Sequence, residues 1–181
     1  MISSLPQAII LITGIQAAGK STVAQMLAER LPRSAHIRGD LFRRMIVSGR
    51  ADMTPDPSDE AIRQLRLRHR LTATTCDEYF REGFTPIAQD VILGDHLTDM
   101  VHMIRQRPLL GVVLAPRPDV VSAREAARHK DAYDQWSIDA LDQELRAWTP
   151  RLGLWLDTSD QTPEETVEEI LRRAWMEAQI S

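Results

Sequence analysis

Apolar runs alternate along the chain with segments in which apolar residues recur every three or four positions. Short continuous apolar runs are typical of strands buried on both faces, and the three-to-four spacing is typical of helices with one buried face. The runs predict strands at residues 8–13, 34–40, 84–90, 109–115 and 152–158. The spacing predicts helices at 20–31, 41–49, 58–82, 94–106, 117–130, 137–148 and 162–178.

Strands that alternate with helices indicate right-handed βαβ units. We therefore expect an α/β fold: a doubly wound, mainly parallel five-stranded sheet with helices on both faces. A chain of 181 residues suits a single domain, residues 1–181, with a small mobile helical lid at about 117–136. In such sheets, ligands bind at the carboxyl ends of the strands.

The longest predicted helix, 58–82, has an apolar stripe and a basic stretch. The stripe that we expect to be buried consists of Ile62, Leu65, Thr72, Cys76, Tyr79 and Phe80. The basic stretch RQLRLRHR, at 63–70, contains no aromatic residues, so we interpret it as a solvated face. Contact with nucleic acid is the alternative.

The composition narrows the function classes. The formal net charge of -4 and pI near 5.7 argue against a general nucleic-acid coat. Cys76 is the only cysteine, which excludes a disulfide framework and a thiolate metal cluster. No apolar run is long enough for a membrane span or a signal peptide, so we expect a cytoplasmic protein without a membrane partner. The oligomeric state is left open.

Residues 14–22, GIQAAGKST, lie between the first predicted strand and the first predicted helix and satisfy G-x-x-x-x-G-K-[ST]. In such a phosphate loop, backbone N–H groups and the helix N-terminus surround an anion, and glycines permit close approach. Lys20 would bridge the β- and γ-phosphates of ATP, and Ser21 would ligate Mg²⁺. The predicted nucleotide-binding residues of the loop are Gly14, Ile15, Gln16, Ala17, Ala18, Gly19, Lys20, Ser21 and Thr22. A glycine-capped turn with an incidental lysine is the alternative.

A phosphate loop alone does not identify a reaction. The chain contains no asparagine, so the N-K-x-D guanine-reading motif is absent and a GTP switch is disfavoured. None of the apolar strands ends in the acidic pair expected of a motor ATPase. A small kinase needs a carboxylate near the acceptor hydroxyl and arginines near the transferring phosphoryl group.

The stretch GDLFRR supplies the carboxylate. Asp40 follows the second predicted strand and is the candidate general base, with Arg43 one helical turn later facing the acceptor or the γ-phosphate. Asp40 as a helix N-cap is the alternative, and both roles can coexist.

Two further elements contribute candidates. Arg124 and Arg128 are four residues apart in REAAR, so both project from one face of a helix that suits a lid over ATP; Arg124 is also a nucleotide-binding candidate. The alternative is a solvated face in which they pair with Glu125. Asp90 ends the third predicted strand and is a candidate to order Mg²⁺-bound water or to hold the acceptor. A capping or sheet-end role is its alternative.

The order of phosphate loop, GDLFRR, strand-ending QD and REAAR resembles the small P-loop kinases that include chloramphenicol phosphotransferase and polynucleotide kinase. The segment AAGKS is closer to the chloramphenicol phosphotransferase type. Asp40 followed by Arg43 resembles the polynucleotide kinase pattern. The resemblance implies a nucleoside-kinase-like P-loop NTPase fold, Asp40 as catalytic base, and Arg124 and Arg128 as lid arginines. No stretch identifies a chloramphenicol pocket.

Three functional hypotheses follow. The first is an ATP- and Mg²⁺-dependent phosphotransferase that moves the γ-phosphate to a hydroxyl of a small molecule, with an antibiotic or other natural product among the candidates. The second is a polynucleotide or nucleoside kinase. The third is a regulatory module that binds ATP without transferring phosphate. In the kinase hypotheses the catalytic candidates are Asp40, Lys20, Arg43, Arg124 and Arg128, and the metal candidates are Ser21 and Asp90.

Overall fold

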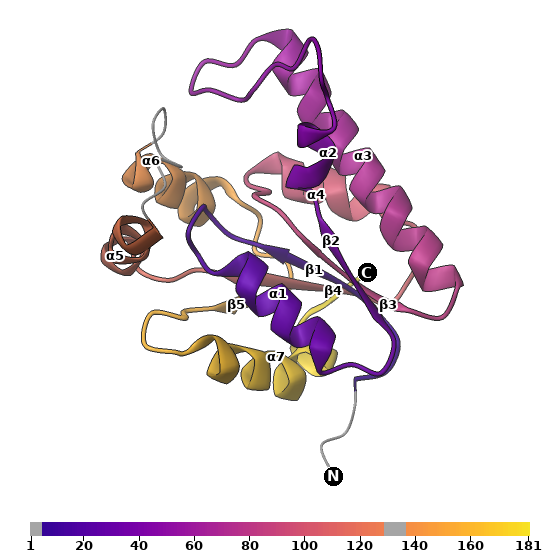
Figure 1. Ribbon diagram of the computed structural model, residues 1–181. Helices are drawn as coiled ribbons and strands as arrows, with labels where there is room; N and C mark the ends of the chain where they lie inside the picture. The colour runs from indigo at the N-terminus through magenta and orange to yellow at the C-terminus, as the bar shows by residue number, and fades with distance from the viewer. Residues whose placement is uncertain (1–4, 129–136) are drawn as a thin grey trace.

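The computed structural model describes residues 5–128 and 137–181 (Figure 1). Its strands are β1 (Ile9–Thr13), β2 (Ser34–Arg38), β3 (Thr85–Gln89), β4 (Leu109–Leu114), β5 (Leu154–Leu156) and β6 (Gln179–Ile180). Its helices are α1 (Lys20–Glu29), α2 (Asp40–Arg44), α3 (Asp59–Arg81), α4 (Asp95–Met103), α5 (Pro118–Arg128), α6 (Ile138–Gln143), the π-helix η1 (Glu144–Trp148) and α7 (Pro163–Glu177). In this part of the chain, no helix combines the length and apolarity needed to cross a membrane.

The sheet is mainly parallel, as predicted, with the strand order β2-β3-β1-β4-β5. The predicted α/β class is confirmed, but the prediction of five strands is wrong, because β6 adds a sixth. It runs antiparallel to β4, and Ile180 pairs with Leu109. Gly111, which has no side chain, leaves room for Ile180. A two-residue strand carries no periodic pattern, so its position depends on packing that the sequence does not reveal.

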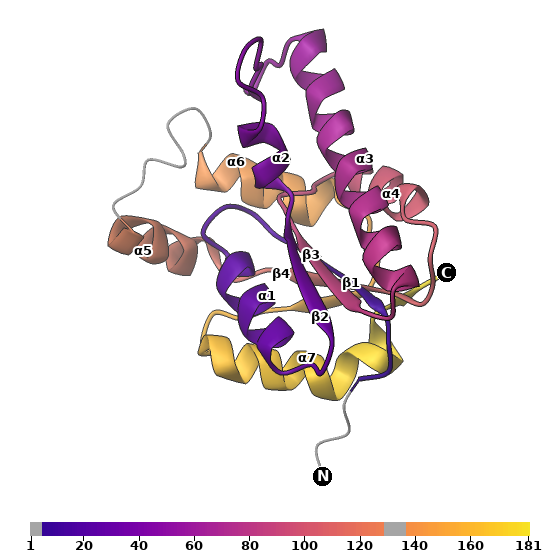
Figure 2. The same ribbon diagram turned by 45° about the vertical axis from the view of Figure 1, so that its right-hand side comes forward.

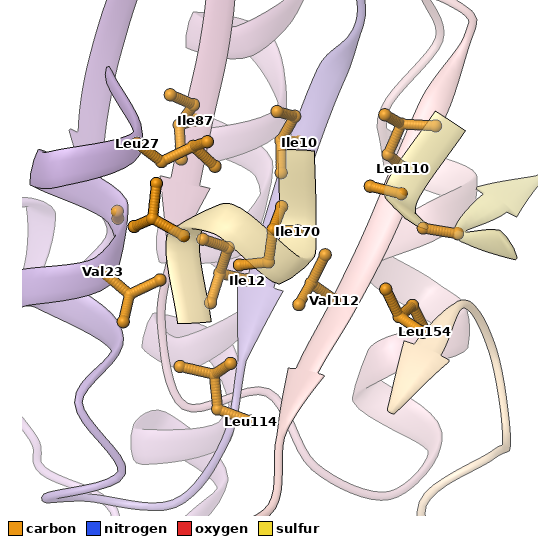
Figure 3. Packing of buried hydrophobic residues seen from close by; sticks show 14 of the residues in the cluster. Ile10, Ile12, Val23, Leu27, Ile87, Leu110, Val112, Leu114, Leu154 and Ile170 are labelled. Atoms are coloured by element: carbon orange, nitrogen blue, oxygen red, sulfur yellow. The ribbon is translucent and has the colours of Figure 1, made fainter. Parts of the chain in front are cut away.

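Helices cover both faces of the sheet. Helices α1 and α7 lie side by side on one face, and α3 and α4 lie on the other (Figures 1 and 2). Figure 3 shows the α1–α7 side, where Val23 and Leu27 of α1 and Ile170 of α7 pack against Ile10 and Ile12 of β1. All five side chains are buried, so this apolar contact holds α1 against β1 and places the loop 14–19 at the end of the strand.

Helix α3 is the longest, and Ser58 caps its N-terminus by accepting a hydrogen bond from the Ala61 N–H. Thr72 and Cys76 are buried as predicted, but Tyr79 is 43% exposed, contrary to the prediction. The buried face of this helix passes through Ala73 and Asp77, which leaves Tyr79 at its edge.

Helix α2 is shorter than the predicted helix 41–49 because it ends at Arg44. Beyond it, Met45 and Val47 are 69% and 95% exposed, so these two apolar side chains contribute little packing that could sustain another helical turn. Residues 45–58 instead form a connection to α3. Gln64 of α3 holds this connection by accepting from the Ala51 N–H at 2.8 Å and donating to the Gly49 carbonyl at 2.8 Å.

Candidate active site

A cleft of about 1570 Å³ opens at the carboxyl end of the sheet. The loop after β1 lines it together with α2, α3, the end of β3, α5, α6 and the start of α7. Figure 2 shows these elements gathered around the same end of the strands. This is the edge where doubly wound sheets bind ligands.

The loop between β1 and α1 has the backbone that an anion cradle needs. Gly14 (φ 155°) and Gly19 (φ 94°) have positive φ, and a Cβ on Gly14 would lie 2.6 Å from the Leu114 carbonyl oxygen. Ala17 also has positive φ, 61°. Gly19 is the N-cap of α1, and no side chain accepts a hydrogen bond there. The first N–H groups of α1 are therefore not capped by a side chain, and the positive end of the helix dipole points into the cleft.

Lys20 is buried, and its ammonium group donates to the Ile15 carbonyl at 2.7 Å. Burial lowers its pKa from 10.5 to about 8. This pKa also reflects the charges around the lysine: that of Asp90 raises it, and those of Arg128 and Arg68 lower it. The lysine thus lies over the loop with its ammonium group held by a backbone carbonyl, and a bound phosphate group would add negative charge to that of Asp90.

Asp40 is the first residue of α2, directly after Gly39. Gly39 occupies the N-cap position and no side-chain cap bond is present, so Asp40 does not act as the N-cap. Its carboxylate accepts from Arg43 Nε at 2.9 Å and Arg44 Nε at 2.7 Å, and Arg68 Nη1 lies 3.7 Å away. Partial burial would raise the pKa of Asp40, but the arginines outweigh it and the pKa is lowered. Asp40 is therefore ionised at neutral pH, as a proton acceptor must be.

Asp90 follows β3, is 4% exposed, and binds Arg68 of α3 through both carboxylate oxygens. Arg68 Nε donates to Oδ2 at 2.6 Å, and Nη2 donates to Oδ1. Asp90 Oδ1 also accepts from the Val91 N–H at 2.8 Å, in keeping with the predicted sheet-end role. A Cβ on Gly39 would collide with this carboxylate, which explains a glycine between β2 and α2.

Arg68 is the site residue that the sequence analysis missed. It belongs to the stretch 63–70, which was interpreted as a solvated face, yet its side chain is 15% exposed. Arg68 lies three residues after Leu65 and four before Thr72, so it falls on the predicted apolar stripe. A charged residue on a stripe that is otherwise apolar indicates a buried ion pair, and this signal could have identified Arg68 from the sequence.

Arg124 lies against the phosphate loop. Its Nη1 donates to the Ala18 carbonyl at 3.4 Å and its Nη2 to the Thr158 carbonyl at 3.1 Å. Arg128, the last residue of α5, also lines the cleft. Both arginines of the predicted lid thus face the cleft, and residues 129–136 of the predicted lid lie outside the described residues.

Ser21, Asp40 and Asp90 all line the cleft and offer oxygen donors of the kind that Mg²⁺ prefers. The donor set fits a nucleotide-bound Mg²⁺, which usually takes only one or two protein ligands. No cluster of three or more His, Cys, Asp or Glu that could hold a metal by itself occurs among residues 5–128 and 137–181. The metal roles of Ser21 and Asp90 stay predictions, and Asp90 would have to share its oxygens with Arg68.

Comparisons with known proteins agree with this fold. The model of the AAA_33 family, an AAA domain, matches residues 9–151. A sugar kinase from Janibacter sp. HTCC2649 is 19% identical, covering 92% of this chain and 94% of that chain at a TM-score of 0.67. The Deinococcus radiodurans tunicamycin resistance protein is 18% identical, covering 97% and 100% at a TM-score of 0.64.

A gluconokinase from Sinorhizobium meliloti 1021 is 18% identical, covering 91% of this chain and 90% of that chain at a TM-score of 0.59. No curated protein sequence matches the chain. The structural likenesses show the fold, which is that of the small P-loop kinases, as the sequence resemblance predicted.

Proposed function

The chain belongs to the AAA_33 family of AAA domains, and from that membership and the cleft we propose that it is an ATP-dependent phosphotransferase. It moves the γ-phosphate of ATP to a hydroxyl group of a small molecule. The single observation that supports this most is the shared cleft, in which the phosphate loop with Lys20 is combined with the ionised carboxylate of Asp40. Solved kinases of the same fold add support.

At the phosphate end, the N–H groups of residues 15–21 hold the β- and γ-phosphates at the start of α1. Lys20 leaves the Ile15 carbonyl and neutralises the transferring group. Arg124 and Arg128 approach from α5 and stabilise the charge that develops in transfer. Ser21 is the residue that would hold Mg²⁺ bound with ATP, and the metal would supply neutralisation of phosphate charge.

At the acceptor end, the hydroxyl oxygen bonds to the γ-phosphorus as the bond from that phosphorus to the β–γ bridging oxygen breaks. The hydroxyl proton passes to the carboxylate of Asp40, and ADP leaves. Arg43 and Arg68 keep Asp40 oriented and ionised until that transfer. The lowered pKa of Asp40 makes it a weak base, which suits a loose transition state in which the hydroxyl loses its proton late.

The test is a screen of alcohols read by ADP release, with mass analysis of each hit. Asp40→Asn should bind Mg·ATP normally while kcat falls about 10²–10⁴-fold, because an amide cannot take up the proton. Lys20→Ala should lose catalysis with little loss of stability. Normal turnover by both variants with an acceptor that is phosphorylated would contradict the site. ATP binding without any phosphorylated product would favour the regulatory module.

A further inference from the structure

One side of the cleft, which we call the acceptor wall, is formed by α2, residues 45–58 and α3. Its main apolar lining residues are Phe42, Ile46, Met53, Leu65, Leu67 and Leu71. None of these six is buried, and Leu67 and Leu71 are each 39% exposed. Apolar side chains that face an open cleft are typical of sites that bind the apolar part of a ligand.

The cations of this wall are already bound to carboxylates. Of its described lining residues, Arg43 and Arg68 carry the positive charge. Arg43 binds Asp40 and, through Nη1 at 2.8 Å, Asp52. Arg68 binds Asp90 and lies beside Asp40. Two guanidinium groups therefore face three carboxylates.

Two further arginines, just outside the cleft, pair with the same carboxylates. Arg44 is 65% exposed and pairs with Asp40, and Arg50 lies 3.6 Å from Asp52. Neither lines the cleft. An acceptor that carries a phosphate, sulfate or carboxylate would need strong charged donors. At this wall it would compete for those donors with the protein's own carboxylates.

We propose, building on the phosphotransferase function, that the acceptor is an uncharged alcohol with an apolar body that packs on the acceptor wall. Arg43 and Arg68 serve the carboxylates of the protein and not an anionic substrate. Nucleotides, 5′-hydroxyl polynucleotides and sugar acids are therefore poor acceptors. Asp52 determines this selectivity, because it occupies the nitrogen of Arg43 that an anion would otherwise bind.

The inference is tested first by binding, which does not depend on turnover. Calorimetry on the full chain loaded with Mg·ADP compares matched pairs: benzyl alcohol with hydroxymethylbenzoate, and adenosine with AMP. The uncharged member of each pair should bind at least about tenfold more tightly, and Leu67→Gln should weaken its binding. Tighter binding of the anionic members, or no binding by either uncharged member, overturns the inference. Failure of the proposed function is a different result: an uncharged alcohol binds but no acceptor gives a phosphorylated product.

A specificity variant provides the second test. Asp52→Asn releases Arg43 from one carboxylate, and the anionic member of each pair should gain about tenfold in affinity relative to the uncharged member. Asp56→Asn is the matched control, because it removes the same charge from the same connection and Asp56 does not line the cleft. An equal gain in both variants, or no gain in Asp52→Asn, overturns the role of Asp52.

Discussion

Arg68 lies where the pattern of α3 requires an apolar residue, and its environment explains why an arginine is tolerated there. Only a planar guanidinium group can bind both oxygens of Asp90 and still lie 3.7 Å from Asp40. Asp90 is nearly inaccessible to solvent, so without this partner its charge would be buried and unpaired. One side chain of α3 thereby connects the ends of β2 and β3.

Arg68→Lys preserves the charge and removes the two-pronged geometry. We expect kcat to fall by about tenfold or more while the KM for ATP stays unchanged, because Asp40 and Asp90 lose their fixed positions. Stability should fall by about 1–3 kcal/mol, through the hydrogen bond lost to a buried carboxylate.

Arg44→Lys is the control for this prediction, because Arg44 also binds Asp40 but is largely exposed. It should change kcat less than about twofold, as expected for an exposed ion pair. Steady-state kinetics and chemical denaturation of both variants provide the comparison. Equal effects of the two substitutions would show that Arg68 has no special positioning role.

Residues of the candidate site could be predicted from the sequence where they lie close to one another along the chain. The phosphate loop is continuous in sequence, and Asp40 and Arg43 are one helical turn apart, so local pattern was enough to identify them. The partners of Asp90 could not be predicted in this way. Arg68 is 22 residues away from it, and only the packing of α3 on the sheet brings the two together.

Among the elements, those with strong local signals were predicted best. Helix α7 begins where Thr162 and Pro163 predict it, and Thr162 and Glu165 form a capping box. Helix α2 was predicted too long, because Met45 and Val47 beyond Arg44 are exposed, and strand β6, which has two residues, was not predicted. The boundaries of such short elements depend on tertiary contacts.

Helix α5 connects two loops at the edge of the cleft through Arg124, which donates to Ala18 and Thr158. We expect Arg124→Ala to lower kcat by on the order of 10²-fold, because in the proposed function the arginine also stabilises charge in the transition state. Arg117→Ala is the control: Arg117 directly precedes α5, is exposed and does not line the cleft. A small change in ATP affinity alone for Arg124→Ala would identify a solvated face, contrary to the lid hypothesis.

At the scale of the whole molecule, the fold class follows from the alternation of strands and helices, because burial of both sheet faces dictates that pattern. The pattern does not show which ionisable side chains are buried between the helices and the sheet, or how burial changes their pKa. His69 of α3 is 1% exposed, neither of its ring nitrogens has a hydrogen-bond partner in the described structure, and its ring contacts that of His96 edge-on. Burial lowers the pKa of His69 from 6.5 to about 4.

This burial predicts how stability depends on pH. This pKa also reflects the charges around the ring: those of Asp90 and Asp99 raise the pKa of His69, and those of His96 and Arg68 lower it. Because the folded-state pKa is depressed, the unfolded chain binds more protons between about pH 4 and 6.5, and stability falls as the pH falls through that window. His69 alone should contribute a loss on the order of 3 kcal/mol by about pH 4.

Chemical denaturation of the wild type, His69→Leu and His102→Gln at about pH 7 and pH 5 tests this dependence. Leucine cannot take up a proton, so His69→Leu should lose less stability on acidification than the wild type does. His102 is exposed on α4, so His102→Gln should behave like the wild type. His36, whose pKa is also lowered to about 4 by burial and then by the charge of Arg38, should preserve part of the pH dependence in His69→Leu. If His69→Leu and the wild type lose the same free energy of unfolding, protonation of His69 does not contribute to acid destabilisation.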